Sequence, residues 1–207
     1  LSAQNQKLRY RPRAYSYVGS VPFLDVFDKP LGEWVAVLKS IEDRVIATAA
    51  LLLFSPILAL IALAIKLDSK GPVFFIQKCF GFNNELIEVF KFRSMHSELT
   101  DPHAERLATR DDPRVTRVGR FLRRTSLDEL PQLINVVNGT LSLVGPRPHA
   151  TKAKAENQLY FDIVEGYFAR HKVKAGITGW AQINGWRGET DTREKILMRV
   201  EHDLYYI

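Results

Sequence analysis

The longest feature of the hydropathy pattern is an apolar run from Val45 to Ile65, in which 21 consecutive residues carry no charge. As a continuous helix this run would be about 32 Å long, close to the ~30 Å thickness of the hydrocarbon core of a bilayer. No polar face recurs at helical spacing, so an amphipathic helix lying on a membrane surface fits poorly. A buried core helix is less consistent with this length. The run therefore predicts a membrane segment.

Ser55 and Pro56 interrupt the middle of this segment. Proline removes the amide that would pair with the carbonyl of Leu52, so the local geometry favours a kinked helix that still spans the bilayer. The alternative is a helical hairpin that enters and leaves the same leaflet, because each arm would be only ~16 Å long. Basic residues flank both ends, so the positive-inside rule gives no reason to place the ends on opposite sides. In either case we expect the Ser55 hydroxyl to bond a backbone group freed by the proline.

The rest of the chain alternates short apolar stretches with turn residues. Residues 1–34 are rich in basic residues and proline, and they predict either a linker from an upstream region or a basic arm near anionic lipid. Residues 35–70 contain an amphipathic lead-in and the membrane segment, and residues 71–207 predict a small α+β domain that is mainly helical. Within that domain we expect strands at 73–77 and 86–92 around a turn at 81–85, a loop or short helix at 96–113, a loop at 176–188, and helices at 115–124, 126–137, 152–170 and 192–206.

Composition and charge limit the function classes. The 207 residues are 46% hydrophobic, an ordinary balance for a folded protein, and carry a formal net charge of +6. A positive balance points to anionic partners such as nucleic acid, lipid headgroups or phosphorylated substrates. The single cysteine, Cys79, excludes an internal disulfide framework and a cysteine-cluster metal site. The sequence has no P-loop, dinucleotide-binding or Asp-x-Asp motif, and its five histidines lack zinc-ligand spacing.

The first candidate for chemistry is the adjacent pair Asp128 and Glu129, which follows two arginines. Ser126, with Glu129 three residues later, also fits a capping box at an ordinary helix start. In a functional interpretation, both carboxylates stay ionised at a helix N-terminus beside the arginines. One carboxylate would then attack a phosphorus atom while its neighbour holds Mg²⁺ on the phosphate oxygens. The local sequence leaves both interpretations open.

Two further motifs could bind phosphate. Arg147 lies between Pro146 and Pro148, whose restricted backbone would display the guanidinium with little loss of entropy; a rigid turn with a solvated arginine is the alternative. Lys91 and Arg93 lie at the end of a predicted strand, where ligands often bind in α/β architectures. A dense run of arginines before the acidic pair could track nucleic acid. Beside a membrane segment, however, lipid headgroups or phosphorylated substrates are the nearer anions.

These motifs, in this order and spacing, resemble the bacterial sugar transferase family, the monotopic polyprenyl-phosphate phosphoglycosyl transferases. The resemblance covers most of the chain from about residue 41 onward, with a departure at Cys79-Phe80-Gly81, where basic and polar residues are commoner. Besides the Ser-Pro break, the segments that carry it are Gly71-Pro72-Val73-Phe74-Phe75, Lys91-Phe92-Arg93-Ser94-Met95, Asp112-Pro113-Arg114-Val115-Thr116, Thr125-Ser126-Leu127-Asp128-Glu129-Leu130-Pro131, Ser142-Leu143-Val144-Gly145-Pro146-Arg147-Pro148 and Gly176-Ile177-Thr178-Gly179-Trp180-Ala181-Gln182.

The resemblance implies a transfer of hexose-1-phosphate from a UDP-sugar to undecaprenyl phosphate, with release of UMP. By this resemblance Asp128 attacks the β-phosphorus and carries the phosphosugar covalently, while Glu129 assists through Mg²⁺ bound at the two carboxylates. Arg147 and Arg124 look like the contacts to the diphosphate. The resemblance extends more loosely to three further substrate-binding residues, Lys91, Arg93 and Asp203.

The resemblance also bears on the membrane segment. In the family the Ser-Pro break makes this segment re-entrant, which reverses the preference for a spanning helix and makes Ser55 and Pro56 the break of a helical hairpin. The protein would then lie at the cytoplasmic face of the bacterial inner membrane. There it would open the assembly of an exopolysaccharide, capsule or O-antigen.

The remaining expectations concern the ends of the chain and its partners. Residues before about 41 resemble the connector of larger family members, so we expect the chain to be part of a longer protein. Residues 189–206 resemble the glucose branch and favour glucose over galactose as the hexose. The oligomeric state stays open, and a homodimer is compatible with the sequence. The alternative from another class is a non-catalytic, membrane-attached scaffold that holds anionic lipid, whereas the membrane segment disfavours nucleic acid as a partner.

Overall fold

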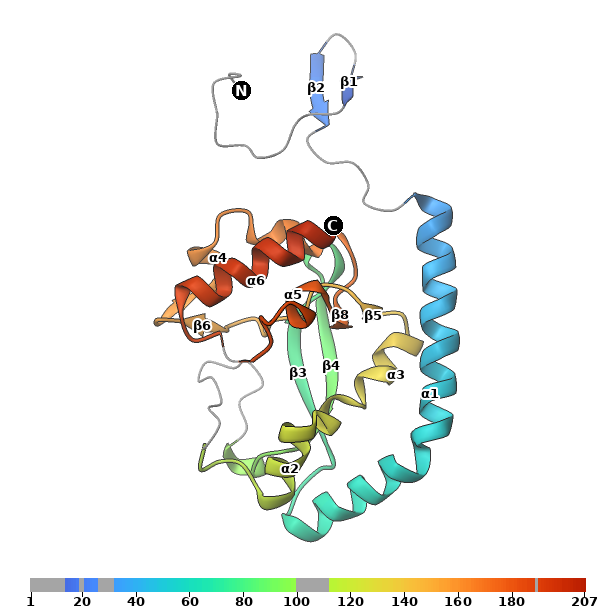
Figure 1. Ribbon diagram of the computed structural model, residues 1–207, viewed down its shortest axis with the longest axis vertical. Helices are drawn as coiled ribbons and strands as arrows, with labels where there is room; N and C mark the ends of the chain where they lie inside the picture. Colours follow the sequence, from blue (N-terminus) through green and yellow to red (C-terminus); the bar gives the residue numbers. More distant parts are fainter. Residues whose placement is uncertain (1–13, 19–20, 26–31, 100–111, 189) are drawn as a thin grey trace.

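The computed structural model describes residues 14–18, 21–25, 32–99, 112–188 and 190–207. One long helix accompanies a group of short helices and strands (Figure 1), which confirms a mixed helix and sheet fold in which helices predominate. Inside the predicted linker, the strands β1 (Ala14–Val18) and β2 (Val21–Asp25) pair antiparallel, which the sequence pattern did not predict. Most of the predicted loop at 96–113 lies outside the described residues.

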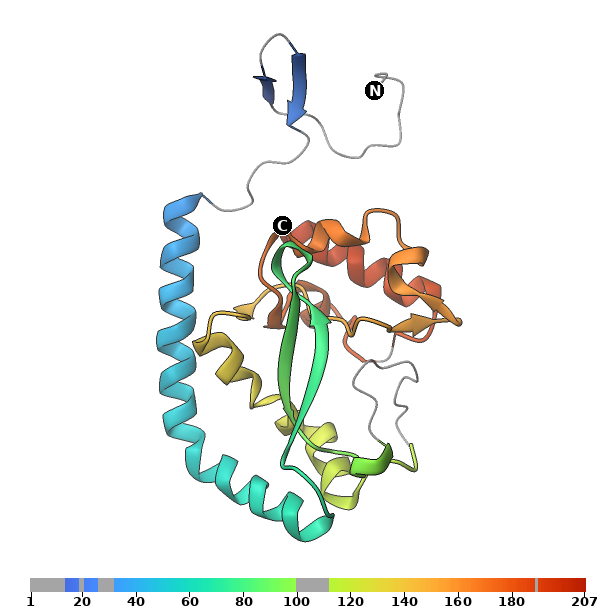
Figure 2. The same ribbon diagram turned by 180° about the vertical axis from the view of Figure 1, so that it is seen from behind.

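The apolar run lies within a single helix of 36 residues, α1 (Glu33–Asp68), which includes Pro56. The helix runs along one side of the molecule and bends toward its C-terminal end, as both views show (Figures 1 and 2). The Ser55 hydroxyl donates a hydrogen bond to the Leu52 carbonyl at 2.8 Å. This is the carbonyl that the proline leaves without its usual amide, so the predicted role of Ser55 is confirmed. The segment is one bent helix in this structure, and not the two antiparallel arms of the expected hairpin.

Most apolar side chains of α1 are not covered by the protein. Leu52 and Leu53 are each 73% exposed, and Leu60 is 67% exposed. Among the described residues, α1 is the one helix long and apolar enough to cross a membrane by length and composition. A core helix of the same composition would be covered by its own domain, so these side chains require another apolar environment. The helix therefore supports association with a membrane.

Both ends of the apolar stretch are hydrogen-bonded to the rest of the protein. Before it, the buried carboxylate of Asp43 accepts a hydrogen bond from Ser142 Oγ at 2.7 Å. After it, the buried guanidinium of Arg93 donates to the carbonyls of Ser69 at 2.7 Å and Lys70 at 2.9 Å. These carbonyls lie just past the end of α1, where backbone oxygens lack intrahelical partners. The helix is thus fixed to one domain at two points that enclose the apolar stretch.

The predicted strand pair forms an antiparallel hairpin of β3 (Phe74–Phe80) and β4 (Leu86–Phe92). The turn falls at the predicted residues, where the Gly81 amide donates to the Glu85 carbonyl at 2.8 Å. The first strand continues three residues beyond the predicted end at residue 77. The two apolar stretches and the turn between them therefore identified both strands correctly.

A buried side chain completes the open edge of β4. Asn135, from α3 (Gln132–Val137), accepts a hydrogen bond from the Phe90 amide at 2.9 Å and donates to the Glu88 carbonyl at 2.6 Å. These bonds replace the ladder bonds that a further strand would make, so two backbone groups are not left unpaired. An apolar core lies between α1, the hairpin and α3, and it fixes α3 between the long helix and the strands.

Two of the remaining helices were predicted correctly. The helix α2 (Arg117–Thr125) begins after Thr116, whose hydroxyl accepts from the Gly119 amide at 2.9 Å. The last helix, α6 (Arg193–Tyr206), begins after Thr192 in the same manner. The other short elements are β5 (Ser142–Val144), β6 (Lys154–Ala155), β7 (Gln158–Leu159), α4 (Tyr160–Ile163), β8 (Gly176–Thr178) and α5 (Trp180–Ile183).

The predicted helix at 152–170 is wrong. Strands β6 and β7 form a tight hairpin whose two loop residues, Glu156 and Asn157, have φ angles of 49° and 65°. Two-residue loops with positive φ match the twist of paired strands, so this local turn competes successfully with a helix. Only short helical turns follow it. The predicted loop at 176–188 also contains regular structure, because β8 pairs in parallel with β5 and is followed by α5.

Candidate active site

Asp128 and Glu129 lie in η3 (Leu127–Glu129), a single 3-10 turn between α2 and α3. The preceding residue, Ser126, ends α2 in a left-handed conformation with φ of 60°, and its side chain does not cap the turn. The expected capping box of Ser126 and Glu129 is therefore wrong, and the predicted helix at 126–137 is divided into η3 and α3. The reason is that the Ser126 amide bonds carbonyls of α2, so this residue terminates one helix instead of starting the next. Both carboxylates are thereby left free of helix capping.

Glu129 is held by Arg147. One guanidinium nitrogen of Arg147 donates to Glu129 Oε2 at 3.0 Å, and the second donates to Oε1. This bidentate geometry uses the planar fork of arginine and fixes the direction of both side chains. Burial alone would raise the pKa of Glu129, but the charge and hydrogen bonds of Arg147 lower it to about 2. Glu129 is consequently a carboxylate at any physiological pH.

Asp128 has the opposite environment. Its carboxylate makes no hydrogen bond or ion pair with the part of the chain that the structure describes. Burial raises the pKa of Asp128 to about 6, and the adjacent charge of Glu129 adds to the rise. The charges of Lys91, Arg123 and Arg147 oppose it. At neutral pH Asp128 is therefore mostly ionised, partly desolvated and not committed to a protein partner, which is the state of a poised nucleophile.

The cations beside Asp128 come from β4 and α2. Lys91, on β4, donates to Gln77 Oε1 at 2.6 Å and acts on both carboxylates through its charge. In the last turn of α2, Arg123 has a buried Nη1 atom without a hydrogen-bond partner among the residues that the structure describes. The predicted Arg124 is exposed. The helical period could have distinguished Arg123 from Arg124. Arg123 lies four residues after the buried Gly119 and so on the same face of α2, whereas Arg124 lies three residues after an exposed phenylalanine.

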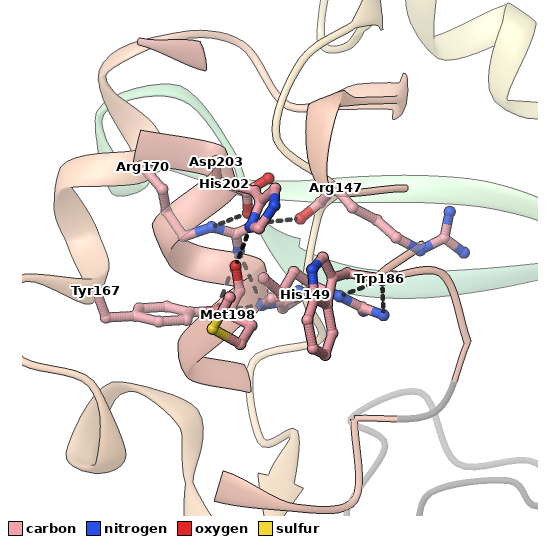
Figure 3. A network of polar contacts seen from close by, with 9 residues as sticks. Arg147, His149, Tyr167, Arg170, Trp186, Met198, His202 and Asp203 are labelled. Carbon is pink, nitrogen blue, oxygen red and sulfur yellow. Dashed lines mark hydrogen bonds and ion pairs between the residues drawn. The ribbon is translucent and has the colours of Figure 1, made fainter. Parts of the chain in front are cut away.

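A buried network lies behind Arg147 (Figure 3). Arg170 donates to the backbone carbonyl of Arg147 at 2.6 Å and to the Asp203 carboxylate at 3.0 and 2.5 Å. It also contacts His149 Nδ1 at 2.8 Å. Figure 3 shows the Arg147 guanidinium pointing away from this network while its carbonyl faces Arg170, and the guanidinium is paired with Glu129 of the acidic turn. Asp203, predicted as a substrate contact, is 1% exposed and lies in this network.

Close packing of two glycines positions the Arg147 loop. The Gly145 amide donates to the Thr178 carbonyl, and the Gly176 amide donates to the Pro146 carbonyl, each at 2.9 Å. A Cβ atom on Gly176 would lie 2.1 Å from the Gly145 nitrogen, so no larger residue fits without moving the backbone. The loop after β5 is therefore fixed against β8 before the arginine is reached.

The structure does not bring Arg93 to this group. Its guanidinium donates to the backbone at the end of α1, to Ser69 Oγ and to Ser97 Oγ, the last two at 2.9 Å each. Sequence alone could not distinguish the roles of Arg93 and Lys91, because the two residues lie two positions apart at the end of the same strand. Of the seven predicted chemical residues, four lie at or beside the acidic turn: Asp128, Glu129, Arg147 and Lys91.

A cleft of about 430 Å³ opens beside Glu129. It lies between α1 and the segment that contains α5, and its wall includes Arg187, a residue that sequence reasoning missed. Arg187 donates to Ser126 Oγ and contributes to lowering the pKa of Glu129 through its charge. The contact joins residues 61 positions apart, so no local pattern would have indicated it. The cleft connects the acidic turn to the apolar helix.

Comparison with known proteins identifies the family. The family model described as bacterial sugar transferase matches residues 34–207. The chain belongs to the bacterial sugar transferase family.

Several similar relatives of this bacterial sugar transferase have names that state an activity. The chain is 57% identical over 190 residues to the UDP-glucose:undecaprenyl-phosphate glucose-1-phosphate transferase of Escherichia coli K12, covering 92% of this chain and 40% of that protein. It is 55% identical to the undecaprenyl-phosphate glucose phosphotransferase of Komagataeibacter xylinus, covering 86% of this chain and 34% of that protein. The exopolysaccharide production protein PSS of Rhizobium leguminosarum is 47% identical, covering 83% of this chain and 86% of that protein. The chain therefore spans less than half the length of the first two relatives.

The acidic turn of this bacterial sugar transferase fits a Mg²⁺ ion bound jointly with a phosphate substrate. Within the described residues, no three His, Cys, Asp or Glu side chains gather into a closed metal site. Mg²⁺ commonly uses one or two carboxylates and completes its shell with waters and substrate phosphates. Among the described residues Asp128 has no hydrogen-bond partner, and each Glu129 oxygen keeps a second lone pair beside Arg147. These two residues would hold the ion.

Proposed function

We propose that this chain transfers hexose-1-phosphate from a UDP-sugar to undecaprenyl phosphate and releases UMP. The observation that carries the proposal is the contrast at the acidic turn, where Asp128 is ionised without a partner in the described part of the chain while Glu129 is fixed by Arg147. Family membership and the names of the similar relatives support the same chemistry. Because the first relatives are much longer than this chain, the activity of the whole protein belongs to the proposal as well.

The proposed mechanism is two in-line displacements at one phosphorus atom. The Asp128 carboxylate attacks the phosphorus that bears the sugar, the bond from this phosphorus to the bridging oxygen breaks, and UMP leaves with that oxygen. The product is an acyl phosphate on Asp128 that carries the hexose. A phosphate oxygen of undecaprenyl phosphate then attacks the same phosphorus, and the Asp128 carboxylate leaves unchanged. Each step forms and breaks one phosphorus–oxygen bond, so no proton needs to be supplied.

The cations around the turn have separate tasks. Lys91 and Arg123 lie close enough to lower the pKa of Asp128, and the same charges would neutralise an incoming diphosphate. Arg147 keeps Glu129 ionised and oriented. When bound, Mg²⁺ would supply further charge neutralisation on the phosphate oxygens. Arg123 thus takes the place that the sequence motif suggested for its neighbour Arg124.

We further propose that α1 is re-entrant and that the domain lies at the cytoplasmic face of the inner membrane. The support is that Asp43, before the apolar stretch, and the backbone after it are both bonded to the same domain. A helix that crossed the bilayer would carry these two ends to opposite sides. The bend near Pro56 permits the apolar side chains to enter one leaflet and return. Single cysteines at Arg44 and Lys66, after replacement of Cys79, should both react with an impermeant thiol reagent from the cytoplasmic side only.

The decisive experiment on the chemistry is Asp128→Asn. This variant should release no UMP from UDP-glucose in the presence of undecaprenyl phosphate, because the amide is not a nucleophile. The wild type, stopped during turnover, should gain the mass of a hexose phosphate, and the variant should not. The exposed Asp162→Asn serves as the matched control and should keep the wild-type rate. Normal turnover by Asp128→Asn would refute the covalent step, and an absence of UMP release by the wild type would favour the non-catalytic lipid scaffold.

The hexose is proposed to be glucose, because the names of the similar relatives specify it. The UMP-release assay with a panel of UDP-hexoses tests this directly. A higher kcat/KM for UDP-galactose or a UDP-N-acetylhexosamine than for UDP-glucose would overturn the assignment while leaving the mechanism intact.

A further inference from the structure

The lining of the cleft beside the acidic turn is of two chemical kinds. Six of its residues are apolar: Ala50 and Phe54 of α1, Leu130, Leu133, Ile177, and Ile183 of α5. The others are polar or charged: Ser126, Glu129, Thr178, Gln182 and Arg187. A ligand that matches this lining is apolar over much of its surface and carries a negative charge for the guanidinium of Arg187.

The apolar part of the lining includes residues from the stretch of α1 that the protein does not cover. Ala50 and Phe54 belong to the apolar run, and Phe54 is 37% exposed. On the opposite wall Ile183 is 68% exposed. A hydrocarbon chain already dissolved in the membrane around α1 could enter here without first passing through water. A nucleotide sugar, which is polar throughout, gains nothing from these walls.

The polar part of the lining contains a guanidinium that forms no ion pair with the described residues. The Arg147 fork is occupied by Glu129, whereas Arg187 is exposed and donates to the neutral hydroxyl of Ser126. A guanidinium has five N–H donors, so Arg187 retains donors for a phosphate. The hydroxyl of Ser126, two residues before Asp128 in sequence, orients Arg187 beside the acidic turn.

We propose that this cleft is the binding site of the polyprenyl phosphate acceptor, with Arg187 binding its phosphate and Phe54 and Ile183 lining its prenyl chain. The inference rests on the proposed function, since it assumes that the acceptor is a lipid phosphate that attacks the phosphosugar on Asp128. The inference also assigns the two displacements to different arginines. Arg147 and its neighbours serve the first displacement, and Arg187 serves the second.

The two displacements can be measured separately. Without acceptor, the first displacement gives a burst of UMP no larger than the enzyme concentration, and with acceptor, the second allows turnover. Arg187→Gln should keep the burst rate and amplitude within about twofold of the wild type. Its KM for undecaprenyl phosphate should rise at least about 10-fold, as expected for loss of a charge-assisted hydrogen bond. The exposed Arg193→Gln, at the start of α6, is the matched control and should change neither quantity.

A second pair of variants tests the apolar walls. Ile183→Asn should raise KM for undecaprenyl phosphate but leave KM for a short, water-soluble polyprenyl phosphate unchanged, because the short chain does not reach this wall. Leu197→Asn, at a partly exposed apolar position on α6 outside the cleft, should affect neither acceptor. Circular dichroism and retention in the membrane fraction verify that each variant folds.

The outcomes separate this inference from the proposed function. If Arg187→Gln matches the wild type in both burst and acceptor KM, the cleft is not the acceptor site. If it lowers the burst and leaves acceptor KM unchanged, Arg187 serves the UDP-sugar, which also overturns the inference. If the wild type itself shows no burst, the covalent relay on Asp128 is wrong, and the acceptor KM of the variants still decides whether the lipid occupies the cleft.

Discussion

Two polar regions meet at Arg147, and they differ in how their charges are used. Behind the arginine, Arg170 is fully buried and divides its donors among Asp203, His149 and the Arg147 carbonyl. In front of it, Asp128 has no partner in the described structure, and Arg123 has an unpaired buried nitrogen. In the region behind, the charged groups of Arg170 and Asp203 are paired with each other, although His149 Nε2 has no partner among the described residues, while the region in front retains unpaired charged groups of both signs.

The difference indicates which charges position other residues and which are available to a ligand. A buried group whose bonds all go to the protein has little capacity left for substrate, so Arg170 and Asp203 are best understood as fixing the loop of Arg147. Groups that stay unpaired in a partly buried site raise the free energy of the folded protein, and a bound ligand that pairs with them can lower it. The substrate is therefore expected to contact the front region only.

The largest expected effect comes from breaking the region behind Arg147. Arg170→Met would leave Asp203 buried without a counter-charge and should lower the free energy of unfolding by about 3–5 kcal/mol. The double variant Arg170→Met/Asp203→Leu removes both charges and should recover most of this stability. It should not recover the rate of UMP release, because the Arg147 carbonyl has still lost its donor. Thermal unfolding in detergent and the UMP assay measure the two quantities; recovery of the rate together with stability would show that Arg170 does not position Arg147.

An intermediate effect is expected from pH in the region in front of Arg147. In the proposed mechanism Asp128 attacks as the carboxylate, so single-turnover UMP release should fall below about pH 6, approaching tenfold per pH unit, as the raised pKa of this group is crossed. Glu129, with a pKa near 2, stays ionised throughout this range. Arg123→Gln removes a charge that lowers the pKa of Asp128, so the acid limb should move to higher pH. The exposed Arg120→Gln, on the same helix, should leave the limb in place; identical profiles for both variants would contradict the assignment of Arg123.

The smallest expected effect is at the edge of the region behind Arg147. The Tyr167 hydroxyl contacts His149 Nδ1 at 2.8 Å and accepts from Arg170 at 3.3 Å. Tyr167→Phe should lower the free energy of unfolding by about 1 kcal/mol and change the UMP-release rate by less than about threefold. The exposed Tyr205→Phe is the control and should change neither. A loss of activity far beyond the loss of stability would place Tyr167 in contact with substrate.

Sequence reasoning succeeded where the deciding interactions are local. The apolar stretches on either side of a turn located β3 and β4, and the missing proline amide indicated the bond from Ser55 to Leu52. It failed at residues 152–170, where a two-residue turn with positive φ replaced the expected helix. It also failed at Ser126, because a capping-box spacing does not reveal that the residue already terminates the preceding helix.

Only the residues of the candidate site that lie in recognisable motifs were predictable from the sequence. Asp128, Glu129 and Arg147 carry their chemistry in recognisable motifs, and the structure brings them together. Arg170 and Arg187 act through contacts to residues 23 and 61 positions away, which no periodicity encodes. Arg93 is the opposite case. It lies in a motif that resembles the family, but its guanidinium binds the backbone at the end of α1, 24 positions earlier.

The two attachments of α1 also restrict how the protein can move. Since Asp43 and Arg93 tie the helix to the domain on either side of the apolar stretch, the domain is not attached to α1 through a flexible tether. With α1 in one leaflet, as proposed, the Asp128 carboxylate would be held at one height and one tilt relative to that leaflet. A lipid diffusing laterally there would need to find the site in two dimensions only, and it would arrive already oriented, with its phosphate at the depth where it is needed.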